Sequence, residues 1–409
     1  MGVLHDPSVA LIVDNEIVMA IESEKVTRYK HEISACPVEA IRFILEYNNI
    51  DLKNIDYITT NWKAGFLANK LYLKHLFRFA QRHCYPLSIF PTFLSIANSH
   101  NKAAFSKLQK DYIPPIVQVK HHLAHLGSCY TLSPYEEAAV AIIDGSGELE
   151  CTSLYHCTGR KIKKLYSMDL PLDSLGFIYI MATIHLGYNK LGDEYKVMGL
   201  APYGRRHQKF EEFFKNLIRL LPNGRYQVDR KLAGNYLVNE YVFPKHTQTI
   251  IGLHKPESVS QFTQEHMDFA YALQSRIEEA IIHVVRHLRK LTKAKYLALA
   301  GGVALNSVSN GKIRENIDFE DIFIQPAAHD AGTALGAAAF VQYHQLGLER
   351  PHPFTHAYLG PSYDGAQIES ELQKVKAPYK RVKNELLSNL VYSIRRPSCL
   401  ADRLLVPHL

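Results

Sequence analysis

Two segments of the chain begin in the same way, and this repetition constrains the fold more than any other feature. Residues 9–23, VALIVDNEIVMAIES, hold two β-rich runs joined at Asp14-Asn15, a pair typical of a tight hairpin turn. Residues 138–156, AAVAIIDGSGELECTSLYH, resume the same hairpin style. A chain that restarts in its second half predicts two related α/β lobes.

Helices and strands alternate within both halves. Pro37 begins PVEAIRFILEYNN, whose apolar residues follow helical spacing, and IDYITT at 55–60 is typical of a strand. In the second half we expect a helix over about 264–291, strands at 296–300 and 322–324, and a helix in HDAGTALGAAAFVQYHQLG. The pattern weakens after Pro351 and Pro353, which predicts a boundary there.

Residues 66–110 are expected to be mostly helical and are rich in aromatic side chains. These side chains could line a pocket for an acceptor, although a role in the core is expected for most of them. The residues concerned are Tyr72, Phe77, Phe79, Phe90 and Phe93.

Composition narrows the classes of protein. A length of 409 residues with 47% hydrophobic residues suits about two compact lobes. The net charge is +7, but the densest basic stretch is only GRKIKK at 159–164, so a nucleic-acid partner is not favoured. The six cysteines form no CxxC pair, which predicts a reducing, cytoplasmic compartment. No apolar run approaches the roughly 20 residues that cross a bilayer, so neither membrane insertion nor secretion is expected.

The segment KHHLAHLGSCY places His121 and His125 four residues apart. On a helix this spacing brings both imidazoles to one face, within reach of one metal ion. His122 does not share that face. Two histidines alone do not complete a site, so the segment is equally consistent with a histidine-rich helix end.

Two aspartates at the ends of other segments could complete the ligand set. Asp144 follows the apolar run AVAII at the start of DGSGE, and Asp330 opens a small-residue helix in IQPAAHDAGTALGAA. Each has an ordinary alternative, since Asp is common in turns and favoured at helix N-termini. Two histidines with two aspartates would suit iron, manganese or zinc better than magnesium or calcium.

Glycine turns after strands suggest where a nucleotide would bind. In YLALAGGVALNSVSNGK, a strand leads into Gly301-Gly302, and Asn306 follows with a polar group suited to ribose or base. Gly145 and Gly147 in DGSGE similarly let the backbone approach a ligand. Glycine pairs after strands are common, so this signal is weak by itself.

Six motifs, in order along the chain, together resemble a known family: HDPSVALIVDNEIV, KHHLAHLGSCY, AIIDGSGE, GDEYKVMGLAPYG, LALAGGVALNSVSNGK and PAAHDAGTALGAA. They are similar to the carbamoyltransferases that include the nodulation and antibiotic-tailoring O-carbamoyltransferases. The resemblance implies an actin-like ATPase fold, a duplicated ribonuclease H-like α/β fold whose two lobes surround a nucleotide and metal cleft. It is shared with the tRNA threonylcarbamoyladenosine synthases.

The resemblance also implies an activity and a ligand set. Such enzymes pass a carbamoyl group from carbamoyl-adenylate, made from ATP and carbamoyl phosphate, to the hydroxyl of a small-molecule acceptor. By the family pattern a divalent metal, iron with manganese or zinc as alternatives, would be held by His121, His125, Asp144 and Asp330.

Two further residues gain roles from the resemblance. His5 matches the family's His-Asp motif and could take the acceptor proton, whereas a histidine near a chain terminus is ordinarily just exposed. Lys196 lies in the EYKVMGLAPYG signature and is expected in the wall of the pocket, with a structural loop as the alternative.

The same resemblance predicts three parts: residues 1–115 as the first lobe, 116–350 as the second lobe with the metal and nucleotide motifs, and 351–409 as a remnant or beginning of a C-terminal domain. Family members usually have several more residues before the His-Asp motif, whereas only MGVL precedes His5. They also continue into a second domain with an arginine-bearing GPRALG stretch, which the last residues of this chain lack. We therefore expect a truncated member, which is either inactive or supplied with carbamoyl-adenylate by a separate protein.

Two alternative functions remain. One is modification of tRNA, in the manner of the threonylcarbamoyladenosine synthases, which would use the positive charge. The other is a non-catalytic, nucleotide-binding remnant of a carbamoyltransferase. A sugar kinase or chaperone ATPase is disfavoured, because those proteins use magnesium with acidic loops and need no paired histidines.

Overall fold

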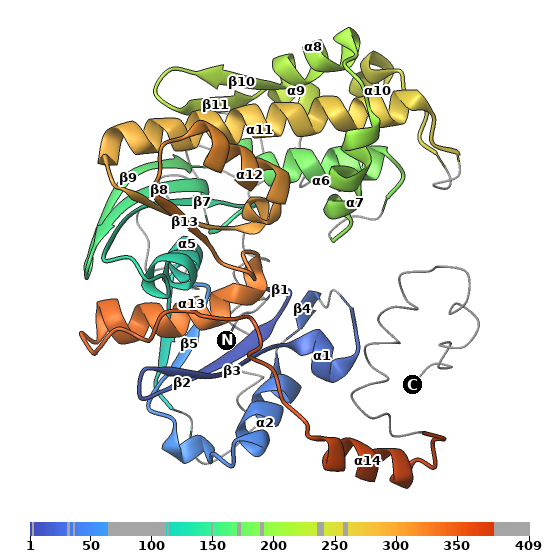
Figure 1. Ribbon diagram of the computed structural model, residues 1–409. Coiled ribbons are helices and arrows are strands. Elements are labelled where there is room, and N and C mark those ends of the chain that lie inside the picture. The colour runs from blue at the N-terminus through green and yellow to red at the C-terminus, as the bar shows by residue number, and fades with distance from the viewer. Residues whose placement is uncertain are drawn as a thin grey trace, which may run out of the picture. The chain divides into compact units, whose positions relative to one another are not determined.

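The computed structural model of the protein (Figure 1) describes residues 1, 4–30, 33–35, 37–63, 112, 114–148, 150–169, 173–188, 192–234, 241–256 and 261–379. The chain divides into two compact units, residues 1–360 and 361–409. In the second unit, helix α14 (Gly365–Lys374) begins with a capping box in which Asp364 and Gln367 exchange hydrogen bonds. The lobe boundaries predicted within residues 1–350 stay predictions.

A five-stranded sheet forms the centre of the first unit. Its strands lie in the order β13-β12-β7-β8-β9. The first three are parallel, and β8 is antiparallel to both β7 and β9. The bounds are β7 (Glu137–Ile143), β8 (Glu150–Thr158), β9 (Lys161–Asp169), β12 (Tyr296–Ala300) and β13 (Asp321–Ile324). A three-stranded meander extended by two parallel strands beside its first strand is the ribonuclease H-like sheet, so the predicted α/β fold of the actin-like ATPase type is confirmed.

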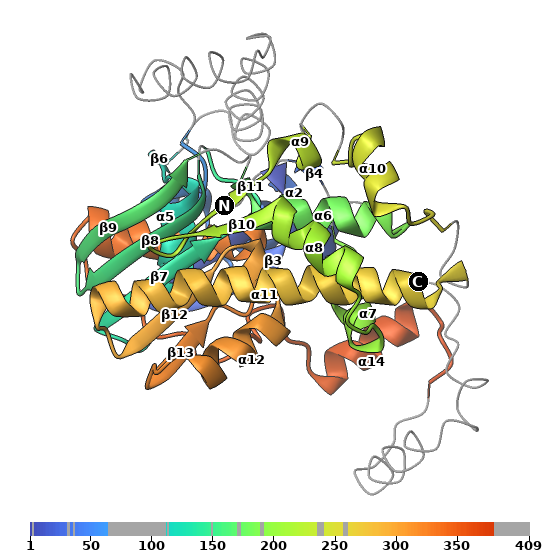
Figure 2. The same ribbon diagram turned by 90° about the horizontal axis from the view of Figure 1, so that it is seen from above.

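Helices cover both faces of the sheet, because its central strands are apolar on both sides. Along β7, alternate side chains such as Ala139 and Ala141 enter one core with α6 (Leu175–His185) and α11 (Gln264–Thr292). The intervening ones, such as Val140 and Ile142, enter a second core with α5 (His121–Leu126), the π-helical turn η3 (Gly127–Thr131) and α13 (Thr333–Phe340). Seen from above, α11 runs across the first face (Figure 2).

The N-terminal strands pair two by two beside α13. The β2-β3 hairpin turns at Asp14 and Asn15, both with positive φ, as the sequence predicted. Strand β1 pairs with β4, and β5 pairs in parallel with β6. The bounds are β1 (Leu4–His5), β2 (Ser8–Val13), β3 (Glu16–Glu22), β4 (Ile33–Ala35), β5 (Ile58–Thr60), β6 (Ile116–Gln118), α1 (Ser23–Thr27), α2 (Val38–Tyr47) and η1 (Leu52–Asn54). Helix α13 contacts β2 and β5, and thus lies between these strands and the sheet.

The remaining elements lie on the α11 side, connect strands, or directly precede and follow α13. They are α7 (Glu194–Leu200), η5 (Ala201–Tyr203), α8 (Gln208–Leu217), β10 (Ile218–Leu221), β11 (Arg225–Val228), α9 (Arg230–Ala233), α10 (Lys245–Ile251), η7 (Gly302–Leu305), α12 (Ser307–Asn316), η8 (Asp330–Gly332) and η9 (Val341–Gln345). Within the described ranges, no helix is long and apolar enough to span a bilayer.

The predicted long helix and the predicted strand after it are confirmed as α11 and β12. After the Gly301-Gly302 pair the chain forms a 3₁₀ turn, η7, and the α-helix α12 begins at Ser307. The helical stretch predicted for residues 66–110, with its aromatic side chains, lies outside the described residues.

Arg350 closes the turn that follows η3. Its side chain is only 18% exposed, and its guanidinium group donates hydrogen bonds of 2.6–3.0 Å to four main-chain carbonyls. Those carbonyls belong to Tyr130, Thr131, Ser133 and Tyr135.

Candidate metal centre

Three separate segments bring their functional side chains to one edge of the five-stranded sheet. His121 is the first residue of α5, and His125 follows one turn later; both are fully buried. Asp144 comes directly after β7, and Asp330 opens η8 shortly after β13. The carboxyl ends of parallel strands meet at the same edge of a sheet, which explains why residues far apart in the sequence converge.

The four ligand atoms lie close together. Nε2 of His121 is 3.1 Å from Nε2 of His125, and 3.3 Å from both Oδ2 of Asp144 and Oδ1 of Asp330. Nε2 of His125 is 3.8 Å and 3.6 Å from the same two oxygens. The structure therefore brings together all four side chains that the sequence nominated as ligands.

These distances suit a bound cation. An ion about 2.1 Å from each of four tetrahedral ligand atoms needs those atoms roughly 3.4 Å apart. The separations that involve a histidine are 3.1–3.8 Å, and all four atoms lie within 4.8 Å of one another. Two neutral imidazoles with two carboxylates also balance a divalent charge. The mixed nitrogen and oxygen set suits iron, manganese or zinc.

The protonation equilibria also favour positive charge at this point. Burial would lower the pKa of His121, but Asp330 and Asp144 outweigh it and hold that pKa well above its ordinary value. Burial would conversely raise the pKa of Asp330, but His121 and His125 hold it below its usual range. The cluster therefore stabilises positive charge, which a proton or a metal ion can supply.

The glycine pair after β12 orients one of the carboxylates. The Gly302 N–H donates to Oδ1 of Asp144 at 2.8 Å, while Oδ2 of Asp144 faces the histidines. Gly301 has φ +96° and ψ 153°, and a Cβ atom there would lie 2.2 Å from the carbonyl oxygen of Ile143. Only glycine permits so close a backbone crossing. The sequence had assigned Gly301 and Gly302 to a nucleotide. The Gly301 N–H donates to the Ala328 carbonyl and the Gly302 N–H to Asp144, and nucleotide binding by this pair stays a prediction.

The other predicted nucleotide-binding residues have structural partners. The Asn306 side chain accepts from the N–H of Ser309 as the cap of α12 and exchanges hydrogen bonds with Gln274. Gly145 lies against the Phe177 ring, and Gly147 against the His122 ring. Nucleotide binding by these residues stays a prediction.

His5 and Lys196 were predicted from the family pattern alone. His5 lies in β1, where its backbone pairs with Ile33, and its side chain is outside the described part of the structure. The Lys196 side chain is 39% exposed, and its ammonium group pairs with Asp193 at 2.7 Å. It is not brought into the four-residue cluster, so its place in a pocket wall also stays a prediction.

His122 lies beside the cluster without contributing an atom to it. Its Nδ1 is 2.7 Å from Oγ of Ser153, which in turn donates to Glu150 at 2.5 Å. Burial lowers the pKa of His122 from its ordinary value. This position agrees with the expectation that His122 is not a ligand.

Sequence reasoning missed two residues at the centre. Glu148 accepts hydrogen bonds from the backbone N–H of His121 at 3.0 Å and of Lys63 at 3.1 Å. Trp62 stacks on the His121 ring. The signals were weak: Glu148 ends the DGSGE stretch, and Trp62 is the single tryptophan of the chain.

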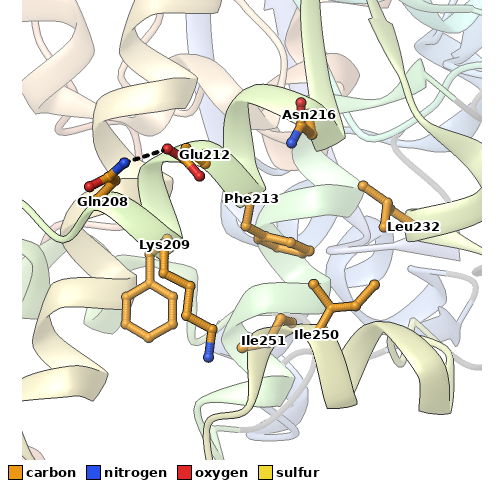
Figure 3. A pocket seen from close by; sticks show the side chains of 9 residues that line it. Gln208, Lys209, Glu212, Phe213, Asn216, Leu232, Ile250 and Ile251 are labelled. Carbon is orange, nitrogen blue, oxygen red and sulfur yellow. Dashed lines mark hydrogen bonds between the residues drawn. The ribbon is translucent and has the colours of Figure 1, made fainter.

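A cavity of about 630 Å³ lies elsewhere, between α8, α9 and α10 (Figure 3). Its lining includes Lys209, Phe213 and Ile250 and none of the residues predicted for chemistry. Converging ligand atoms are a more specific sign of function than a hollow, so we place the candidate site at the metal cluster.

Several known proteins are similar to this chain in sequence. The family described as carbamoyltransferase N-terminus matches residues 2–339. Nodulation protein NolNO of Sinorhizobium fredii is 33% identical over 382 residues, which cover 90% of this chain and 51% of that protein. Nodulation protein NolO of Bradyrhizobium diazoefficiens is 37% identical over 250 residues, covering 61% and 43%.

An uncharacterised protein of Synechocystis is 33% identical over 403 residues, covering 95% of this chain and 65% of that one. Among solved structures, full-length HypF in a phosphate- and nucleotide-bound form has a TM-score of 0.40 at 13% identity, covering 82% of this chain and 54% of that one.

The chain spans about half of NolNO and less than two thirds of the other two relatives. The family match nevertheless covers the whole five-stranded sheet and all four converging side chains. The chain therefore belongs to the carbamoyltransferase N-terminal family.

Proposed function

We propose that this chain carries out the transfer step of an O-carbamoyltransferase. In this step the hydroxyl oxygen of a small-molecule acceptor attacks the carbamoyl carbon of carbamoyl-adenylate. A C–O bond forms to the acceptor, the C–O bond to the phosphate breaks, and AMP leaves with that oxygen and its electron pair. The acceptor's proton passes to a base, for which His5 is the candidate.

The observation that carries this proposal is the convergence of the two histidines and two aspartates described above. A divalent metal held by His121, His125, Asp144 and Asp330 would act as a Lewis acid on the phosphate and carbamoyl oxygens. Iron is favoured by the family pattern, with manganese or zinc as alternatives.

The chain's own residues prepare the site for this chemistry. The Gly302 N–H fixes one oxygen of Asp144 and directs the other toward the histidines. Glu148 holds the backbone N–H at the start of α5 and so fixes the position of His121. Ligand atoms already within 3.8 Å of each histidine Nε2 need little rearrangement to bind a cation.

The experiment compares metal binding by the parent protein, His125→Ala and Asp144→Asn, after purification under reducing conditions. His352→Ala is the matched control, because His352 is 61% exposed and lies outside the cluster. Each cluster variant loses a direct ligand, so its affinity should fall by more than the ~10–100-fold typical of losing an outer partner. Elemental analysis and competition with a chelator measure the change.

Transfer is then tested with carbamoyl-adenylate and a panel of hydroxyl compounds. Release of AMP that depends on the acceptor, together with a carbamate ester detected by mass spectrometry, supports the proposal. Folded cluster variants that keep full metal content contradict the ligand assignment. A metal-loaded parent that never transfers the carbamoyl group contradicts the proposed reaction.

A further inference from the structure

The two imidazoles of the candidate centre lack a usual restraint. A histidine that binds a metal through one ring nitrogen generally donates the other N–H to an acceptor, which fixes the orientation of the ring. Nδ1 of His121 and Nδ1 of His125 are both buried, and neither has a hydrogen-bond partner among the described residues. Another contact must therefore hold the rings.

For His121 that contact is the indole of Trp62. The two rings are stacked, with centroids 4.7 Å apart and an interplanar angle of 24°. The His125 ring meets His121 edge-on, with centroids 4.6 Å apart at 85°. The His121 ring is thus restrained by a stacked ring and by a perpendicular ring, although its Nδ1 has no hydrogen-bond partner within the described ranges.

The backbone around Trp62 is tied to the same centre. The Lys63 N–H donates to Oε1 of Glu148, the carboxylate that also accepts the His121 N–H. The Thr60 hydroxyl donates to the Trp62 carbonyl at 3.2 Å. The Glu148 carboxylate therefore fixes the backbone next to both stacked rings, so the stack is held in place by the fold.

We propose that Trp62 is a positioning residue for the metal ligand His121, and that its stacked ring replaces the missing outer hydrogen bond. This inference rests on the proposed metal site. Binding a cation through Nε2 makes the imidazole more positive, and the electron-rich face of an indole attracts positive charge more strongly than that of a benzene ring. Metal binding and stacking therefore strengthen each other.

The test measures metal affinity in Trp62→Phe and Trp62→Leu by competition with a chelator. The leucine variant keeps an apolar side chain but loses the stack, so its affinity should fall by ~10–100-fold, the cost typical of an outer partner. The phenylalanine variant should recover most of that loss. Phe43→Leu is the control, because it breaks a Phe43–Tyr47 stack in the N-terminal core, outside the four-residue cluster. It should leave metal affinity unchanged.

A second readout needs no substitution of Trp62. Trp62 is the only tryptophan, so its emission reports on this stack alone. Titrating the metal-free parent with Co²⁺ should change the emission in proportion to the metal bound, and His125→Ala should abolish that response. A parent that binds no metal contradicts the proposed function itself.

A parent that binds metal while Trp62→Leu binds it equally tightly overturns the positioning role and leaves the metal site standing. If Trp62→Leu does not fold, the phenylalanine variant and the emission titration decide. Trp62 emission that stays unchanged while one metal ion binds per protein molecule overturns the inference.

Discussion

Replacing Gly301 with alanine should damage both the sheet and the candidate metal centre. Gly301 joins the end of β12 to the turn whose next N–H orients Asp144. Its φ of +96° and ψ of 153° lie in a region that is essentially restricted to glycine. An added Cβ would also lie 2.2 Å from the carbonyl oxygen of Ile143, a backbone atom at the end of β7.

The cost can be worked from these two terms. Holding a non-glycine residue in such a conformation costs about 1–3 kcal/mol. Forcing a methyl group into a packed position costs about 1–3 kcal/mol more, since a backbone atom cannot swing away as a side chain does. Gly301→Ala should therefore lower the free energy of unfolding by about 2–6 kcal/mol. If the turn shifts to relieve the overlap, Asp144 loses its hydrogen bond and metal affinity falls as well.

Urea unfolding of the metal-free protein measures the stability, and elemental analysis of refolded samples measures metal content. Gly311→Ala is the matched control, because no atom lies within 4 Å of the added Cβ and Gly311 is inside α12. That change should stabilise the protein by roughly 0.5–1 kcal/mol through helix propensity. A Gly301→Ala protein as stable as the parent would refute the reasoning about the backbone crossing.

Two further predictions concern stability away from the centre. Burial lowers the pKa of both His185 and His344 to about 4, so between the unfolded value of about 6.5 and pH 4 only the unfolded chain gains the proton. Each of these two histidines should therefore lower the free energy of unfolding by about 2 kcal/mol between pH 7 and pH 5. Urea unfolding of His185→Phe at both pH values should show a smaller loss than the parent protein. An equal loss in the two proteins would argue against a role of His185. Arg350→Ala leaves four carbonyls without their donor and should lower the free energy of unfolding by about 2–4 kcal/mol. Arg350→Lys should be intermediate, because an ammonium group cannot reproduce the planar guanidinium. Equal thermal stability of the parent and both variants would show that these hydrogen bonds contribute little.

Much of the fold could be predicted because individual strands, turns and helix faces follow from patterns of neighbouring residues. The continuous apolar run before Asp144 predicted a strand buried on both faces, and the Asp14-Asn15 pair predicted the hairpin turn. The spacing of His121 and His125 predicted that both imidazoles share one helix face. These features depend on residues within one turn or one strand of each other.

The missed features depend on contacts between distant segments. Nothing near Gly302 shows that its N–H serves Asp144, since 158 positions separate them. Trp62 and His121 are likewise far apart in the sequence, and the parallel pairing of β5 with β6 brings them together. Spacing also could not show that both histidines are fully buried, and this burial makes it necessary to check folding in the His125→Ala experiment.

The hydrogen bond from Gly302 to Asp144 has a thermodynamic consequence. The turn proposed to receive a nucleotide and the carboxylate proposed to bind the metal are one mechanical unit, joined by a 2.8 Å contact. A ligand that shifts the turn must change the affinity of the centre for its cation. By linkage, the cation must then change the affinity for that ligand by the same factor. Favourable coupling would make each of the two bind more tightly in the presence of the other, and unfavourable coupling would make each displace the other.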